Sequence, residues 1–189
     1  MECISFIKDY IKSDKPYRII EIGVKYGDSI KFCLRELNVE IYIGIDPFET
    51  YADYTHDSFN NTLNQNGDKL YESLVNKYKS APVQFIRAFS DDAHEHIQDE
   101  WADVIFIDGN HSYDYVLRDI SNYFPKVKPG GIICGDDYFM RHKFNGGEYD
   151  MKMVYEAVQD YFANTHYKIE EIGLHRGFNK SWLVKKTSV

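Results

Sequence analysis

Acidic side chains directly follow two largely apolar segments of this sequence. Residues 104–107 lead into Asp108, and residues 131–135 lead in the same way into Asp136 and Asp137. Apolar runs of this length are typical of strands buried on both faces of a parallel sheet, where the ends of neighbouring strands lie roughly 5 Å apart. We therefore expect the three carboxylates to converge. Because they would repel one another, the sequence predicts a divalent cation between them, and an all-oxygen ligand set suits Mg²⁺, Mn²⁺ or Ca²⁺.

A histidine lies close to the first of these acids. His111 is three residues after Asp108, and an ordinary histidine pKa of about 6.5 suits a general base at neutral pH. Plainer interpretations stay open at this point. Asp108 could instead cap a helix over residues 112–124. Asp136 and Asp137 could form an ordinary solvated turn, and His111 could be an ordinary loop residue.

A glycine-containing loop follows the first predicted strand. Residues 21–27 read Glu-Ile-Gly-Val-Lys-Tyr-Gly and join a strand over 18–23 to a helix that opens at Gly27, which is the position of a nucleotide-binding turn. Glu21 replaces the first glycine of the dinucleotide fingerprint. A carboxylate there disfavours a pyrophosphate and favours a ligand with a cationic or ammonium-bearing part. Asp46, 19 residues after Gly27, ends the second predicted strand, where an acid can accept both ribose hydroxyls.

The elements that must position these residues alternate between strand and helix. The predicted strands are 18–23, 40–45, 83–87, 104–107, 131–135, 167–172 and 181–185, and the predicted helices are 2–13, 27–37, 67–79, 91–98, 112–124 and 150–163. This alternation predicts one domain with a doubly wound α/β sheet, closed by an antiparallel pair. Ser90 and Asp91 follow the third strand, at the position expected for an adenine edge. Residues 48–66 are predicted to be a loop with a short helix, and residues 138–149 a loop.

Composition narrows the class of partner. The net charge of −8 disfavours nucleic acid, because phosphate binding depends on neutralisation by lysine and arginine. No apolar run reaches the roughly 18 to 20 residues that span a bilayer, and the N-terminus lacks the features of a signal peptide. Three cysteines without CxxC spacing fit a reducing compartment. We therefore expect a cytoplasmic protein with neither a membrane nor a nucleic-acid partner.

The order of the motifs resembles that of class I S-adenosylmethionine-dependent methyltransferases. The segment 106–113, together with Lys-Pro-Gly-Gly at 128–131 and Asp-Asp-Tyr at 136–138, is similar to a subgroup that includes the macrocin-type sugar O-methyltransferases. That subgroup is related to the cation-dependent catechol and caffeoyl-coenzyme-A O-methyltransferases. The resemblance covers roughly residues 17–138, and it implies a Rossmann-like sheet of seven mostly parallel strands with an antiparallel last strand and helices on both faces.

The resemblance also implies roles for individual residues. S-adenosyl-L-methionine would be held by Glu21, Gly23, Gly27, Ser29, Asp46, Ser90, Asp91 and Asp108. Asp108, Asp136 and Asp137 match the metal-ligand positions for Mg²⁺ or another divalent cation. His111 falls where the catechol enzymes carry a lysine base, so His111 and Asp108 are the predicted catalytic residues. The sequence departs from those enzymes there and at Asp137, where they usually have asparagine.

The predicted function is a cation-dependent O-methyltransferase acting on a hydroxyl with a neighbouring oxygen, such as that of a sugar or another vicinal diol. Residues 1–13, 48–80 and 138–150 lie where such enzymes differ, and the last two segments are expected to lie on the acceptor side. A homodimer is a further expectation from the family. Alternatives are a metal-independent small-molecule methyltransferase, a nicotinamide-dependent oxidoreductase, which Glu21 disfavours, and a non-catalytic module that binds an adenosyl ligand.

Overall fold

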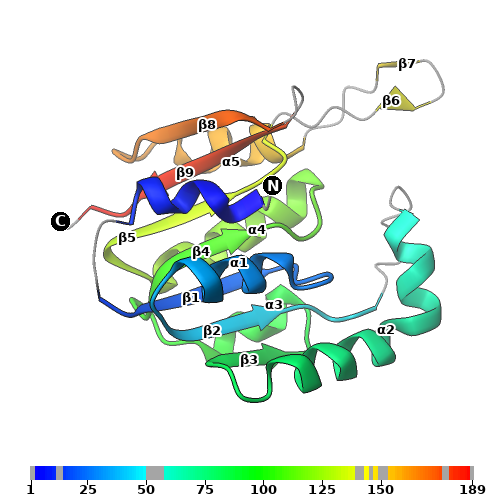
Figure 1. Ribbon diagram of the computed structural model, residues 1–189. Helices are drawn as coiled ribbons and strands as arrows, with labels where there is room; N and C mark the ends of the chain where they lie inside the picture. Colours follow the sequence, from blue (N-terminus) through cyan, green and yellow to red (C-terminus); the bar gives the residue numbers. More distant parts are fainter. Residues whose placement is uncertain are drawn as a thin grey trace.

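A computed structural model describes residues 3–11, 15–49, 58–138, 143–144, 147–148, 153–175 and 179–187. Seven strands form one sheet in the order β3-β2-β1-β4-β5-β9-β8 (Figure 1). The strands are β1 (Tyr17–Ile22), β2 (Val39–Ile45), β3 (Val83–Ile86), β4 (Ala102–Ile107), β5 (Val127–Gly135), β8 (Ile169–His175) and β9 (Asn179–Lys185). The first five are parallel to one another, whereas β9 is antiparallel to both of its neighbours. The predicted mostly parallel sheet is confirmed.

The central strands β1, β4 and β5 end at the same level of the sheet. Ile22 pairs with Ile107, and Ile107 pairs with Gly135. The middle residues Ile105 and Ile133 are fully buried, and removal of this apolar surface from water stabilises the strands by about 25 cal/mol per Å². The residues that follow the three strands therefore meet at one edge, which is where open α/β sheets bind their ligands.

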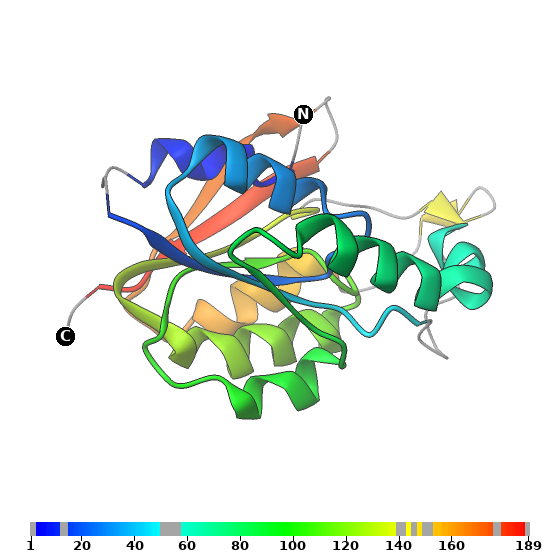
Figure 2. The ribbon, with the colours of Figure 1, turned by 60° about the horizontal axis from the view of Figure 1, so that its bottom comes forward.

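Helices cover both faces of the sheet, as predicted (Figure 2). One face packs against α3 (Ser90–Ala93), α4 (Tyr113–Tyr123) and α5 (Val154–Phe162). The other face packs against the N-terminal helix η1 (Cys3–Asp9), α1 (Asp28–Glu36) and α2 (Ser58–Tyr78). Two short 3₁₀-helices complete the set, η2 (His94–His96) and η3 (Phe124–Lys126).

The two last strands form the predicted antiparallel pair and extend the sheet beyond β5. In the register of β5 with β9, Gly135 pairs with Trp182. The residue after Gly135 and the residue before Trp182 are thereby brought next to each other, a placement that matters for the site. No helix within the described ranges is both long enough and apolar enough to cross a membrane.

The N-terminal helix differs from its prediction. An α-helix was expected over residues 2–13, and the structure has a 3₁₀-helix over Cys3–Asp9. Ile4 and Ile7, three residues apart, are both fully buried. This spacing places two side chains on one face of a helix with 3.0 residues per turn as well as of an α-helix, so the apolar pattern does not distinguish the two.

The segment between β2 and β3 also differs. The predicted helix over 67–79 forms the second part of a longer helix, α2 (Ser58–Tyr78), which begins inside the segment 48–66 that was predicted as a loop with a short helix. The first half of α2 is rich in asparagine and contains Gly67, and because these residue types have poor helix propensity, the helical pattern there is too weak to predict the full length of the helix. Residues 50–57 lie outside the described residues.

Two segments around β5 differ from the prediction. The first is Lys-Pro-Gly-Gly at 128–131, which lies within β5 itself, because the strand begins at Val127 and not at residue 131 as predicted. The second, the predicted loop over 138–149, contains two paired two-residue strands, β6 (Lys143–Phe144) and β7 (Gly147–Glu148). The remainder of this acceptor-side segment beyond Tyr138 lies outside the described residues.

Candidate active site

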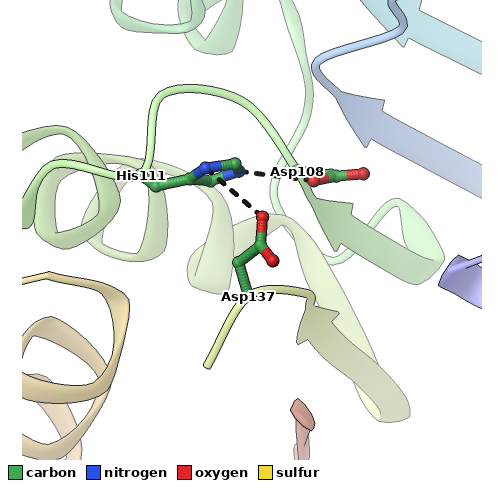
Figure 3. Close-up of side chains that lie close together, drawn as sticks. All are labelled: Asp108, His111 and Asp137. Carbon is green, nitrogen blue, oxygen red and sulfur yellow. Dashed lines mark hydrogen bonds and ion pairs between the residues drawn. The ribbon is translucent and has the colours of Figure 1, made fainter. Parts of the chain in front are cut away.

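Two acids and a histidine come together at the ends of β4 and β5 (Figure 3). His111 Nε2 lies 3.4 Å from Asp108 Oδ1, and His111 Nδ1 lies 3.4 Å from Asp137 Oδ2. The imidazole is thus placed between two carboxylates. One ligand atom from each of the three side chains lies within 4.8 Å of the others. We call Asp108, His111 and Asp137 the acidic triad.

Backbone contacts explain why Asp108 points into this site. Its N–H donates to the carbonyl of Ile22 at 2.8 Å, which continues the β1–β4 pairing by one residue. Helix α4 begins five residues later, and the N–H of its N-cap residue, Ser112, donates to Asn110 Oδ1 at 3.0 Å. The helix start is therefore organised by Asn110 and Ser112, which removes the main reason to regard Asp108 as a helix cap.

Asp136 takes a different position from its neighbour Asp137. Its side chain is buried, and Ser181 Oγ on β9 donates a hydrogen bond to Asp136 Oδ1 at 2.8 Å. Asp137 has a left-handed backbone, with φ +53, and its carboxylate turns toward His111. Among the described residues, the group of potential ligands therefore contains Asp108 and Asp137 together with His111. Asp136 stays a predicted ligand, since a carboxylate has a second oxygen.

The electrostatics of the triad follow from burial and mutual proximity. Burial raises the pKa of Asp108 and raises that of Asp137 to about 6, and the neighbouring acids add to both effects. Burial alone would lower the pKa of His111. The hydrogen bond with Asp108 and the charges of both triad acids outweigh it, so the pKa of His111 is raised. A positive charge between these acids is therefore favourable, whether it is a proton on the imidazole or a metal cation.

The donor set fits a divalent cation. His111 Nδ1 is buried and has no hydrogen-bond partner among the side chains that the structure describes. Carboxylate oxygens suit Mg²⁺ and Mn²⁺, and an imidazole nitrogen is a good ligand for Mn²⁺ and later transition metals. Asp108 and Asp137 would hold the cation, and Asp136 and His111 are the side chains from which further ligands could come.

The glycine loop lies against the triad. Gly23 has φ +89, and a Cβ atom built on it would lie 2.2 Å from the carbonyl oxygen of Asp108. Only glycine permits so close an approach. Gly27, with φ +73, is the N-cap of α1, and Tyr78 on α2 donates a hydrogen bond to its carbonyl at 3.2 Å. The loop therefore leaves a helix N-terminus and bare backbone beside Asp108, a cradle that fits a nucleoside cofactor with a charged end.

Asp46 clamps this loop. Its Oδ2 accepts the N–H groups of Val24 at 2.9 Å and Lys25 at 3.1 Å, and its Oδ1 accepts that of Phe48 at 2.7 Å. The carboxylate thus joins the loop after β1 to the loop after β2. These three hydrogen bonds leave acceptor capacity on Oδ1, so the predicted contact with a ribose hydroxyl stays a prediction.

Glu21 lies beneath the loop and not on its surface. It is only 1% exposed, and Ser29 of α1 and Tyr42 of β2 lie beside its carboxyl. Burial raises the pKa of Glu21 well above its ordinary value, and the two hydroxyl groups oppose this shift. Glu21 Oε2 has no hydrogen-bond partner among the described groups. The structure thus gives Glu21 and Ser29 a role in packing α1 on the sheet, and their contact with a cofactor is untested.

Ser90 and Asp91 lie at the end of β3, where α3 begins. Asp91 accepts hydrogen bonds from Arg118 Nε at 3.0 Å and from Asn122 Nδ2 at 3.2 Å. The carbonyl of Ser90 accepts the hydroxyl of Tyr123 at 2.9 Å. Both residues therefore join α3 to α4, and their predicted contacts with an adenine stay predictions.

Two residues of this region were missed in the sequence. Lys25 lies inside the glycine loop, and its positive charge partly opposes the rise that burial causes in the pKa values of Asp108 and Asp137. A lysine between the two glycines of the loop was a visible signal. Ser181 gave no signal, because only the antiparallel pairing of β9 with β5 brings it to Asp136, 45 residues away.

The chain is similar to known methyltransferases. Residues 20–138 match the family described as a methyltransferase domain. An uncharacterised protein of Acanthamoeba polyphaga mimivirus is 31% identical over 170 residues, which cover 87% of this chain and 69% of that protein. An uncharacterised protein of Sinorhizobium fredii is 27% identical over 141 residues, but these cover only 15% of its length.

Solved structures show the same fold. A SAM-dependent methyltransferase from Aquifex aeolicus superposes with a TM-score of 0.65 at 11% identity, over 96% of this chain and 88% of that one. An O-methyltransferase family protein from Burkholderia thailandensis gives 0.64 at 12% identity, over 97% of this chain and 55% of that one. The family match covers most of the sheet and every element around the glycine loop and the triad. The chain therefore belongs to this family of methyltransferases.

Proposed function

We propose that the enzyme is an S-adenosylmethionine- and divalent-cation-dependent O-methyltransferase that acts on a hydroxyl of a sugar or another small molecule with a vicinal diol. The observation that carries this proposal is the acidic triad, which lies beside the glycine loop at the ends of β1, β4 and β5. The O-methyltransferase family protein of similar fold adds support. A sugar as acceptor rests on the resemblance of the sequence motifs to the macrocin-type enzymes.

A cation held by Asp108 and Asp137 explains why the acceptor should carry two adjacent oxygens. When bound, a divalent cation lowers the pKa of a hydroxyl that contacts it and fixes its orientation. Two neighbouring oxygens can approach one ion together, which a single hydroxyl cannot do. Asp136 would be a further ligand, and its hydrogen bond from Ser181 at 2.8 Å would fix the direction in which its carboxylate points.

His111 is the proposed general base. Its imidazole takes the proton from the acceptor hydroxyl, and the acceptor oxygen forms a bond to the methyl carbon while the bond from that carbon to sulfur breaks. The cofactor supplies an electrophilic methyl group on a sulfonium. The products are the methyl ether, S-adenosylhomocysteine and a proton on His111. The carboxylates of Asp108 and Asp137, each 3.4 Å from a ring nitrogen, stabilise the imidazolium that forms.

A metal-independent methyltransferase is the second candidate, and the same triad supports it. Protonated His111 between Asp108 and Asp137 compensates much of the negative charge without any metal. In that case the acids orient the histidine and the acceptor by hydrogen bonding alone. The two candidates differ in their dependence on added metal.

The test is methyl transfer to a panel of sugars in metal-free buffer and with Mg²⁺ or Mn²⁺ added. The proposal predicts that activity needs a metal, that sugars with a free vicinal diol are methylated, and that derivatives with one of the two hydroxyls blocked are not. Asp137→Ala, which removes the ligand oxygens, should abolish the response to metal, whereas Asp92→Ala, at an exposed acid on α3, should leave it unchanged. Full transfer in the presence of a chelator would favour the metal-independent enzyme.

A further inference from the structure

Lys25 has a backbone that the structure holds firmly in an uncommon conformation. Its φ is +51, in the left-handed region that costs a non-glycine residue about 1–2 kcal/mol. Its N–H and that of Val24 both donate to Asp46 Oδ2, at 3.1 and 2.9 Å. Because the backbone is clamped from below, the direction in which the lysine side chain leaves the loop is also set.

The side chain of Lys25 leaves the loop beside the acidic triad. The loop follows β1, the neighbour of β4, and a Cβ on Gly23 would lie 2.2 Å from the backbone of Asp108. The positive charge of Lys25 acts on both triad acids, Asp108 on β4 and Asp137 after β5. Lys25 itself is exposed. Its ammonium group is therefore accessible to solvent and near enough to both carboxylates for its charge to act on them.

The distribution of charge in the site can be compared with that of the cofactor. The adenine and ribose of S-adenosylmethionine are uncharged, and all of its charges lie toward the methionine end: a sulfonium, an ammonium and a carboxylate. In the site, both signs occur together at the ends of β1, β4 and β5, where the charge of Lys25 acts on Asp108 and Asp137. The acids can receive the cationic groups, but they would repel the carboxylate. Within the glycine loop, residues 21–27, Lys25 is the one cationic side chain.

We propose that the ammonium group of Lys25 binds the α-carboxylate of the methionine moiety of the cofactor. In this arrangement the methionine moiety of the cofactor, which carries both charges, binds between groups of opposite charge. Lys25 contacts its carboxylate, and the acids of the triad lie on the side of its cationic groups. The inference rests on the cofactor part of the proposed function and on neither the cation nor the acceptor.

The experiment compares two ligands that differ only in this carboxylate. S-adenosylhomocysteine and its decarboxylated analogue, which keeps the thioether and the ammonium group, are titrated calorimetrically into wild type, Lys25→Gln and Lys25→Arg. Lys31→Gln, at an exposed lysine of α1, is the matched control. Thermal unfolding of each variant confirms that it is folded.

The expected result is a loss that depends on the ligand. Lys25→Gln should bind S-adenosylhomocysteine about 10-fold more weakly, because a charged hydrogen bond is lost, and should bind the decarboxylated analogue as wild type does. Lys25→Arg keeps the charge and should keep most of the preference for the carboxylate. Lys31→Gln should bind both ligands normally.

Other outcomes would overturn the inference in ways that can be told apart. If Lys25→Gln weakens both ligands equally, Lys25 acts only through the shape of the loop. If it weakens neither, the carboxylate is bound elsewhere. If wild type binds neither ligand, the cofactor assignment itself fails, and the inference fails with it.

Discussion

Gly23→Ala is the substitution that most directly tests how closely the glycine loop approaches the catalytic acids. At Gly23 two features coincide: a left-handed backbone with φ +89 and a built Cβ only 2.2 Å from the carbonyl oxygen of Asp108. Gly130 in β5 shares the first feature, with φ +83, but no atom of the described residues lies within 4 Å of a Cβ built on it. Gly130→Ala is therefore a control that isolates backbone strain from steric overlap.

The loss of folding free energy expected for each variant follows from its position in the structure. A left-handed alanine costs about 1–2 kcal/mol at either position. For Gly130→Ala this is the whole effect, and it should lower Tm by about 2–8 °C in a domain of this size. At Gly23 the methyl group meets backbone atoms that can yield only if the loop or β4 moves, and overpacking of this kind adds about 1–3 kcal/mol. Gly23→Ala should therefore cost about 2–5 kcal/mol in total.

Urea unfolding and calorimetric titration with S-adenosylhomocysteine measure the two consequences. Gly23→Ala should lose more stability than Gly130→Ala and should also lose affinity for the ligand, because the loop is pushed away from Asp108. Gly130→Ala should keep wild-type affinity. Equal loss of stability in the two variants, with unchanged affinity in both, would refute the proposed contact between loop and acid.

Two further predictions concern titrating groups. If His111 is the base, it must be neutral to act, so kcat/KM should fall as the pH drops through its raised pKa. Asp137→Asn should move that fall to lower pH, and His111→Ala should lower kcat by about 10²–10⁴. A flat pH–rate profile would contradict this role. Burial raises the pKa of Asp119 on α4 to about 7, so the folded state resists ionisation and stability should fall as the pH rises from about 4 to 7. Asp119→Asn, neutral throughout, should therefore be more stable than wild type at pH 8 by up to a few kcal/mol but not at pH 4, and urea midpoints that show no such gain at pH 8 would contradict the account.

The architecture was predictable because its signals are local. The apolar runs that form β1, β4 and β5 are typical of strands buried on both faces, and each is followed by the residues that define the site. The first half of α2 was predicted only as a loop with a short helix, because asparagine and glycine have poor helix propensity, while the helix also depends on contacts with residues distant in the sequence. Gly67 illustrates this, since a Cβ there would lie 2.0 Å from the carbonyl oxygen of Phe48.

The composition of the site was predictable, but its pairings were not. The sequence indicated that Asp108, Asp136 and Asp137 would converge, yet it could not show that Ser181 engages Asp136 while His111 lies between the other two. Those contacts depend on the register of β9 and on the left-handed backbone at Asp137. A cation was predicted because the sequence places three acids together without a compensating charge. In the folded protein two basic side chains, those of His111 and Lys25, also act on these acids.

The proposed cofactor and metal site is tested most directly by calorimetric titration of the wild-type protein with S-adenosylhomocysteine, in metal-free buffer and then with Mg²⁺. We expect saturable binding at a single site with a micromolar dissociation constant, and a further heat on addition of Mg²⁺ that Asp137→Ala abolishes. Binding without any heat from metal would favour the metal-independent enzyme. No binding of S-adenosylhomocysteine under either condition would contradict the assignment of this site to the cofactor, and with it the proposed reaction.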